Sequence, residues 1–228
     1  MEPDKQHDQL YKIRHSFAHI LAQAVLELRP DSKLGFGPPI EDGCYYDFEF
    51  SKPLQECDLA AIEKNCRKII KQNQKFEHRS LAAKEAVDLL QSRGELYKVE
   101  YCQELIGRGE TTIGFYKNGP FEDMCAGPHL VTTSEIPEGC FKIDSIAGAY
   151  WRGDEKRPQL TRLYCLVFGS KAELEEYLTR RKLAEERDHR RLGKELEIFT
   201  TSEDLGPGLP IWLPNGAVIR QELEKFAC

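Results

Sequence analysis

Apolar positions recur with helical spacing between Asp8 and Arg29, and Pro30 ends the pattern. At roughly 100° per residue, one set of apolar residues shares a face and a second, partly apolar set lies opposite it. The first set is Leu10, Ile13, Phe17, Ile20, Leu21, Ala24 and Leu28. The opposite face carries Ala18, Ala22 and Leu26 together with His15 and His19. The pattern predicts a helix that is covered on both sides, with its two histidines facing a cleft.

The rest of the chain switches between the period of a helix and that of a strand. Strands are predicted over residues 44–50, 76–81, 140–146 and 160–168, and helices over 56–73, 82–93 and 171–196. The clearest hairpin joins residues 112–117 to 121–124 through Asn118-Gly119, a dipeptide that tolerates positive φ in a tight turn. Helices that alternate irregularly with hairpins indicate an α+β fold.

Residues 44–50 alternate, which predicts a half-buried strand with Tyr46, Phe48 and Phe50 on one side. Tyr45, Asp47 and Glu49 fall on the other side, although we expect Tyr45 to join Phe48 in the core. The preceding loop, residues 34–39, contains two glycines and two prolines, which allows its backbone to approach another group closely.

Beyond the charged helix, Gly206-Pro207-Gly208 breaks the pattern. A short apolar stretch at 209–213 and a helix from about Ala217 then read as the opening of another unit. We therefore expect three parts, residues 1–170, 171–197 and 198–228, the last of them truncated.

With 40% hydrophobic and 31% charged residues, the composition is that of a soluble globular protein. The absence of a membrane-length apolar run or a signal-peptide core predicts a cytoplasmic location. Eight scattered cysteines favour reduced thiols. The net charge of −6 argues against indiscriminate binding of nucleic acid. Residues 180–194 nevertheless hold seven basic against three acidic residues, for which a solvated helix with ion pairs is the simpler interpretation.

The candidate chemistry lies in two pairs of residues. His15 and His19 are four apart on one helix, and Cys125 and His129 are four apart in a loop of the sequence Cys-Ala-Gly-Pro-His. The histidine pair alone is more typical of a surface or a satisfied core. The second pair has no packing periodicity to explain it, so both pairs together predict one site. All four are also zinc ligands, although their spacing is looser than that of a zinc finger.

A set of motifs in a specific order resembles the editing domain of bacterial-type threonyl-tRNA synthetase, from about Tyr11 to Phe168. These motifs are His-Ser-Phe-Ala-His (15–19), Gly37-Pro38 before Tyr45-Tyr46-Asp47, Gly-Glu-Leu-Tyr-Lys (94–98), Asp-Met-Cys-Ala-Gly-Pro-His (123–129) and Ala-Gly-Ala-Tyr-Trp-Arg-Gly-Asp (147–154). Residues 171–197 are similar to the linker helix of that enzyme. Residues 206–224 are similar to the entrance of its class II catalytic domain.

The resemblance implies an α+β editing domain, with an antiparallel sheet and packed helices, that hydrolyses serine from mischarged tRNA(Thr) without a required cofactor. It also implies that the ATP-dependent threonine–tRNA ligase activity, with its ATP and zinc sites, lies in a catalytic domain mostly missing here, so this chain should not aminoacylate. The full-length enzyme is expected to be a homodimer without membrane contact.

The resemblance also assigns roles to residues. His15 and Lys98 are expected to hold or activate the attacking water, with His19 beside them, and Asp123 to bind the α-ammonium or hydroxyl of the substrate. Cys125 and His129, with His19, are expected to line the serine pocket, with Gly37 and Tyr46 as its walls. Cys125 as a nucleophile is chemically possible but less favoured.

A tRNA substrate needs positive charge, so the resemblance also strengthens the case for the basic run. Its candidate tRNA-binding residues are Arg180, Arg181, Lys182, Arg187, Arg190 and Arg191. Arg152 is a further candidate, although a structural salt bridge explains it equally well, and we expect Trp151 to anchor its loop by packing.

Two alternatives remain at this point. In the first, His15, His19, Cys125 and His129 bind zinc, as in editing domains of the alanyl type, and the metal lowers the pKa of bound water. In the second, the chain is a catalytically inactive module that binds tRNA or forms a dimer.

Overall fold

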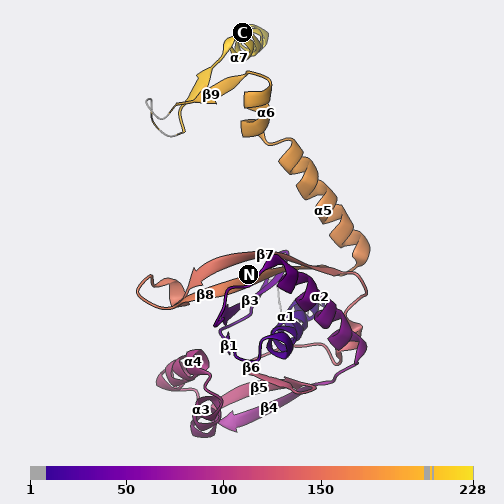
Figure 1. The fold of residues 1–228 in the computed structure, drawn as a ribbon, viewed down its shortest axis with the longest axis vertical. Coiled ribbons are helices and arrows are strands. Elements are labelled where there is room, and N and C mark those ends of the chain that lie inside the picture. Colours follow the sequence, from indigo (N-terminus) through magenta and orange to yellow (C-terminus); the bar gives the residue numbers. More distant parts are fainter. Residues whose placement is uncertain (1–8, 203–205, 207, 228) are drawn as a thin grey trace. The chain divides into compact units, whose positions relative to one another are not determined.

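The computed structural model describes residues 9–202, 206 and 208–227. Figure 1 shows the course of the chain. By its internal contacts the chain divides into two compact units, with the boundary between Leu174 and Glu175.

The helices that the structure describes are α1 (Gln9–Leu28), α2 (Glu56–Lys71), α3 (Ala83–Ser92), α4 (Leu96–Gly107), α5 (Lys171–Glu186), α6 (His189–Glu195) and α7 (Pro214–Ala227). Short 3-10 turns are η1 (Thr133–Glu135) and η2 (Trp151–Gly153). None of the helices among the described residues has the length and apolar character that a membrane span requires. The strands are β1 (Lys33–Leu34), β2 (Pro39–Ile40), β3 (Gly43–Glu49), β4 (Phe76–Ala82), β5 (Thr112–Asn118), β6 (Phe121–Met124), β7 (Phe141–Tyr150), β8 (Gln159–Val167), β9 (Phe199–Thr201) and β10 (Pro210–Trp212).

Two antiparallel sheets build the first unit, which confirms the predicted α+β class. The larger has the order β1-β3-β8-β7, with β2 also paired to β3, and the smaller has the order β4-β5-β6. Helix α1 contacts β3 and β8 of the larger sheet and β6 of the smaller one, so it lies between them (Figure 1). Helices α3 and α4 pack together beside the smaller sheet. In the second unit β9 and β10 form a separate antiparallel pair.

Helix α1 is covered on both sides, as its sequence predicted. Phe17 and Leu21 of the apolar stripe are fully buried, and so are Ala18 and Ala22 on the opposite face. Burying each large apolar side chain contributes about 1.5–3 kcal/mol, which explains why a helix with two apolar faces becomes the centre of the core. Leu28, expected in the stripe, is 42% exposed because the helix ends there.

The hairpin is confirmed, but its turn differs from the prediction. Asn118 pairs with Phe121, so Gly119-Pro120 forms the two-residue turn, and the positive φ of 54° is at Gly119. Asn118 is instead the last residue of β5, with a fully buried side chain. Strand β6 then leads directly into Cys125, as expected.

The predicted helix over 171–196 is wrong as one continuous element. It is broken after Glu186, and α6 starts anew with Asp188 as its N-cap, whose carboxylate accepts the backbone N–H groups of Arg190 and Arg191. An N-capping aspartate offers the chain a new helix start, and this local preference overrides the continuous pattern of charges.

One further helix and two further boundaries differ from the sequence interpretation. Helix α4 was not predicted, because the mixed sequence of residues 96–107 has no clear apolar stripe. Strand β7 continues to Tyr150 because β8 pairs with its whole length. Helix α7 begins at Pro214, where a proline suits the first turn.

Candidate active site

A cavity of about 1050 Å³ opens in the first unit. Its lining includes seven of the candidate site residues, drawn from α1, from the loop before β2, from β3, from β6 and the loop after it, and from η2. These are His15, His19, Gly37, Tyr46, Asp123, Cys125 and Arg152. Lys98 and His129 are not among the lining residues, but Lys98 contacts Tyr46 and His129 contacts Cys125, which both line it.

The two pairs of candidate residues converge, as predicted. The Sγ atom of Cys125 lies 3.2 Å from Nε2 of His15 and 3.1 Å from Nε2 of His129. The ring of His19 lies 4.3 Å from that of His129, measured between centroids. Four atoms, one from each of these residues, lie within 4.8 Å of one another. The convergence requires α1, which carries His15 and His19, to pack against the loop that follows β6.

The Cys125 loop holds its thiol through its own backbone. Gly127 has a φ of 71°, a conformation that glycine adopts without strain, and its N–H donates to Cys125 Sγ at 3.3 Å. A Cβ at Gly127 would lie 2.5 Å from the hydroxyl of Tyr116, so a side chain there would also collide with β5.

The hydrogen bonds around the thiol show which atom donates and which accepts in each pair. His15 Nδ1 lies 3.2 Å from the carbonyl of Pro128, which only accepts, so Nδ1 carries the hydrogen and Nε2 accepts from the thiol of Cys125. Ser16 Oγ accepts the N–H of Leu130 and can donate to His129 Nδ1 at 3.3 Å. His129 Nε2 then donates to Cys125 Sγ. The resulting chain runs from His129 through Cys125 to His15.

Burial keeps these groups neutral. It lowers the pKa values of His15 and His19 to about 4 and strongly lowers that of His129. It raises the pKa of the Cys125 thiol to about 12. At neutral pH the cluster therefore presents neutral imidazoles and a protonated thiol, which is a poor nucleophile.

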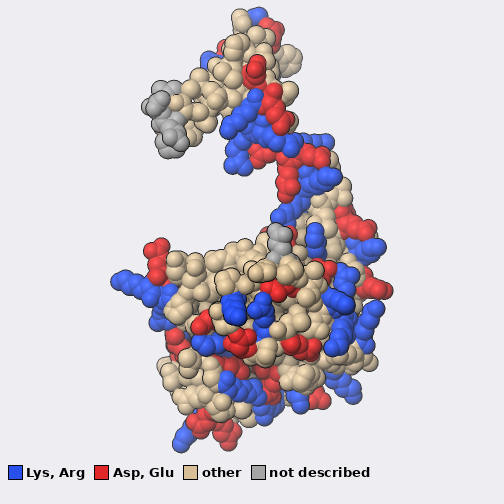
Figure 2. All heavy atoms as spheres, in the orientation of Figure 1, with Lys and Arg blue, Asp and Glu red and all other residues tan. Residues whose placement is uncertain are grey.

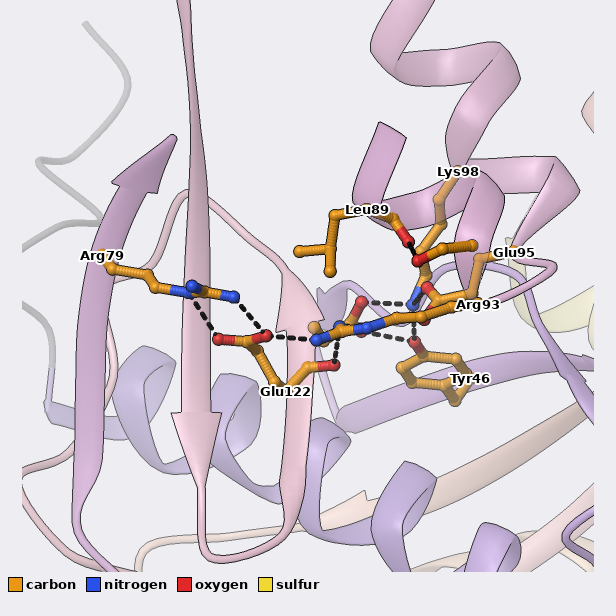
Figure 3. A network of polar contacts seen from close by, with 9 residues as sticks. Tyr46, Arg79, Leu89, Arg93, Glu95, Lys98 and Glu122 are labelled. Carbon is orange, nitrogen blue, oxygen red and sulfur yellow. Dashed lines mark hydrogen bonds and ion pairs between the residues drawn. The ribbon is translucent and has the colours of Figure 1, made fainter. Parts of the chain in front are cut away.

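A buried charged network lies around Lys98, and Figure 3 shows this residue with Tyr46 and Glu95. The hydroxyl of Tyr46 donates to Asp123 Oδ2 at 2.6 Å, and Lys98 Nζ donates to the Tyr46 oxygen at 3.2 Å and forms an ion pair with Asp123 Oδ1. Glu95 Oε2 lies 3.3 Å from the same ammonium. Burial opposes ionisation of Asp123, but Lys98 prevails and the pKa of Asp123 is lowered.

Lys98 occupies a different position from the one its expected contact with water requires. Its side chain has no exposed surface, and the ammonium lies behind Tyr46 and Asp123 as seen from the cavity. Helix α4, absent from the sequence interpretation, delivers it there. His129 similarly lies behind Cys125, with its ring stacked on Phe76 at 5.1 Å between centroids.

Gly37 and Tyr46 form one wall of the cavity. A Cβ at Gly37 would lie 2.1 Å from Cδ2 of Tyr46, so the backbone of this loop rests directly on the aromatic ring. The two glycines of the loop thus allow a close approach of its backbone, as the sequence indicated.

Arg152 and Trp151 both contact helix α4. Arg152 forms ion pairs with Glu100 and Glu104 of α4, and Trp151 donates to Glu100 at 3.2 Å and stacks on Phe36. Trp151 anchors its loop, as predicted. Arg152 still lines the cavity, although its charge is paired.

Sequence reasoning missed Tyr45 and Arg162 as parts of the cavity wall. Arg162 donates to both carboxylate oxygens of Asp47, at 2.7 and 2.8 Å, and its guanidinium lies 3.8 Å from the centre of the Tyr45 ring. Tyr45 is only half-buried and lines the cavity, so its expected place in the core is wrong, whereas Phe48 is fully buried. The strand alternation, which put Tyr45 on the side of Asp47, was the available signal.

The basic run lies on α5 and α6, where acidic and basic side chains are interspersed (Figure 2). Several of its side chains have partners. Arg181 pairs with Glu185, Lys182 with Glu186, Arg190 with Asp188 and Arg191 with Glu195. These contacts agree with solvated helices whose side chains form ion pairs with one another.

The four clustered residues also fit a metal ion. Zinc accepts imidazole and thiolate ligands at about 2.0–2.3 Å, and four ligand atoms within 4.8 Å of one another are close enough to share one ion. Nδ1 of His19 is buried without a hydrogen-bond partner among the described residues. Nδ1 of His15 already faces Pro128, which leaves its Nε2 as the atom toward the cluster.

Comparisons with known proteins show which proteins this chain is similar to. Residues 113–164 match the family described as "Threonyl and Alanyl tRNA synthetase second additional domain". The threonine–tRNA ligase of Pelobacter propionicus is 48% identical over 98% of this chain and 34% of that protein. That of Borreliella burgdorferi is 45% identical over 98% of this chain and 38% of its own length. The chain therefore spans about a third of the length of the relatives it matches. The chain is therefore similar to one region of the threonine–tRNA ligases, and its residues 113–164 match the second additional domain of the threonyl and alanyl tRNA synthetases.

Proposed function

We propose that this site hydrolyses the ester bond between a misattached amino acid and the 3′ end of tRNA, with Ser-tRNA(Thr) as the substrate. The observation that supports this most strongly is the convergence of the neutral His15–Cys125–His129 cluster and the ionised Asp123 on one cavity. One part can orient water and the other can bind an ammonium group. The test is release of serine from Ser-tRNA(Thr) by the 228-residue chain.

A second hydrolytic site is needed because recognition of threonine has a physical limit. Serine lacks one methyl group, and a missing methyl or methylene group is worth only about 1–3 kcal/mol in a synthetic site. Exclusion by crowding works in the opposite direction, because a tight pocket rejects the larger amino acid. Gly37 packs tightly against Tyr46, and the wall that they form is where we expect the threonine methyl group to collide.

Asp123 binds the α-ammonium group of serine in this proposal. Its carboxylate lines the cavity, is held ionised by Lys98 and retains lone pairs beyond those used by Tyr46 and Lys98. Lys98 is thus a positioning residue, which fixes Asp123 and Tyr46, rather than a group that touches water.

His15 and His19 orient the attacking water. For this, the Cys125 thiol turns its hydrogen away from Nε2 of His15 when the substrate binds, so that both neutral imidazoles accept hydrogen bonds from water and direct its lone pair at the ester carbon. The water oxygen then bonds to that carbon, the bond to the ribose oxygen breaks, and one proton of the water passes to the ribose oxygen. Cys125 stays protonated and, with His129 behind it, shapes the pocket for the serine side chain.

A zinc-dependent hydrolase is the second candidate, supported by the tetrad of His15, His19, Cys125 and His129. These four side chains would hold the ion, which when bound lowers the pKa of water. We favour the metal-free account because the hydrogen bonds of His15, Cys125 and His129 already form a complete chain. The ammonium of Lys98, which would repel a dication, is neutralised by Asp123 and therefore contributes less to this choice.

Removal of metal separates these two candidates. After dialysis against a chelator, the chain is expected to contain no stoichiometric zinc by elemental analysis and to release serine at its original rate. Lost activity that returns when zinc is added would instead establish the zinc-dependent hydrolase.

We propose that the basic run also contacts tRNA phosphates. If so, the apparent KM for Ser-tRNA rises steeply with salt concentration. The joint change Arg190→Ala and Arg191→Ala then reduces the slope of log KM against log salt concentration by about one to two, which corresponds to one or two lost phosphate contacts. Arg220→Ala is the matched control, because Arg220 is an exposed arginine on α7 that pairs with Glu224 in the same manner. Equal slopes for all three proteins would leave a solvated helix as the sufficient explanation.

We also propose that a protein with this region and the full length of these relatives attaches threonine to tRNA with ATP, as a cytoplasmic homodimer. The proposal rests on the likeness to threonine–tRNA ligases.

A further inference from the structure

Two buried polar atoms next to the site have no partner among the described residues. They are Nδ1 of His19 and Oδ1 of Asn118. The two side chains are neighbours, since the ring of His19 lies 5.5 Å from that of Phe121 and 6.1 Å from that of Phe76, and both phenylalanines pair with Asn118 in the smaller sheet. The Asn118 amide also opposes the effect of burial on the pKa of His19. Buried polar groups without hydrogen bonds are costly, so a direct contact after a small shift, or one bridging water, is expected between them.

The orientation of the Asn118 amide follows from a line of polar residues along α1. His19, Gln23 and Glu27 recur every four residues and therefore share one face of the helix. The carboxylate of Glu27 can only accept, so the Gln23 amide nitrogen must donate to it, at 3.0 Å. The oxygen of Gln23 then faces Asn118 and accepts its amide N–H at 2.7 Å.

The second contact of the Asn118 amide agrees with this direction. The same nitrogen donates to the side-chain oxygen of Gln74 at 3.1 Å. Both amide hydrogens of Asn118 are therefore used, and its oxygen is left for a donor. Asn118 is fully buried, so the donor must come from its immediate neighbours or from an enclosed water.

We propose that Asn118 is a positioning residue that fixes the tautomer of His19. Nδ1 of His19 carries the hydrogen and donates it to Asn118 Oδ1, directly or through one water. Nε2 is therefore left unprotonated. The carboxylate of Glu27 fixes which atom of Gln23 donates, Gln23 in turn orients the Asn118 amide, and Asn118 orients the imidazole. No signal in the sequence beyond the spacing of His19, Gln23 and Glu27 indicated this role, because Asn118 read as a turn residue.

The kinetic consequence rests on the function proposed above. A lone pair on Nε2 allows His19 to accept a hydrogen bond from the attacking water, and a hydrogen on that atom would point a donor at it instead. An orienting partner on the second ring nitrogen is the usual way in which a protein selects one tautomer.

The tautomer can be measured without any assay of activity. Long-range ¹H–¹⁵N correlation spectra of the ¹⁵N-labelled chain distinguish Nδ1–H from Nε2–H, and His19→Gln assigns the signal. The parent protein is expected to show Nδ1–H at His19. Asn118→Leu and Glu27→Leu are expected to populate Nε2–H, whereas Asn118→Asp retains an acceptor and keeps the hydrogen on Nδ1.

Lys68→Met is the matched control, because it removes a 4.0 Å ion pair of Glu27 but leaves the contact with Gln23. Its spectrum should equal that of the parent. If Asn118→Leu does not fold, the spectra of the parent and of Glu27→Leu still test the tautomer assignment. An Nε2–H tautomer in the parent, or an unchanged tautomer in Glu27→Leu and Asn118→Leu, overturns the proposal.

The kinetic arm separates this proposal from the proposed function. Asn118→Leu should lower kcat for serine release about 10- to 100-fold with little change in KM, and Asn118→Asp should recover most of it. A parent that shows Nδ1–H but releases no serine contradicts the hydrolase and supports the tautomer assignment. A parent that releases serine with Nε2–H at His19 contradicts the tautomer assignment alone.

Discussion

Replacing Lys98 by methionine is expected to lower the rate of serine release at least about 100-fold. It should also lower the free energy of unfolding by about 3–5 kcal/mol, because Asp123 would remain as a buried carboxylate without its counter-charge. Asp123 would then bind a proton rather than the substrate ammonium. Denaturant unfolding and deacylation kinetics measure the two effects separately.

The double variant Lys98→Met with Asp123→Asn separates stability from catalysis. Removing both charges should recover most of the lost stability but none of the activity. Lys33→Met is the control, because Lys33 forms an exposed pair with Glu49 and should cost less than about 1 kcal/mol. Activity within threefold of the parent in Lys98→Met, on the order of normal experimental scatter, would contradict the role of this network.

Replacing His15 by alanine is expected to lower kcat about 10²- to 10⁴-fold with a small change in KM, because His15 orients the water that reacts. Cys125→Ser should affect KM more than kcat, since a hydroxyl still bonds to His15 and His129 but alters the pocket. Rapid-quench deacylation at several concentrations of Ser-tRNA gives both constants. A kcat of Cys125→Ser that falls as far as that of His15→Ala, with serine trapped on the parent thiol, would establish Cys125 as the nucleophile instead.

The parts of the site that could be predicted are those that local patterns determine. Helical periodicity placed His15 and His19 on one face of α1, and strand alternation after the Gly119 turn delivered Cys125. We predicted that the two pairs converge because one shared site was the only common explanation for pairs in unlike local structures. The structure confirms this convergence.

The parts that could not be predicted depend on contacts between distant segments. Asp47 and Arg162 meet only because β3 pairs with β8, and Lys98 reaches Asp123 only because α4 packs beside the smaller sheet. Asn118 shows the same limit, since its turn propensity is local but its role depends on α1. In the second unit, the N-cap at Asp188 divided a helix that charge patterning alone had joined.

The most direct measurement is a comparison of Ser-tRNA(Thr) and Thr-tRNA(Thr) as substrates of the 228-residue chain under identical conditions. Release of each labelled amino acid over time gives the two rates. The account predicts that serine is released at least about tenfold faster, because the extra methyl group of threonine is expected to collide with the wall of Gly37 and Tyr46. Equal rates for the two esters, or no release of serine above the spontaneous rate, would contradict it.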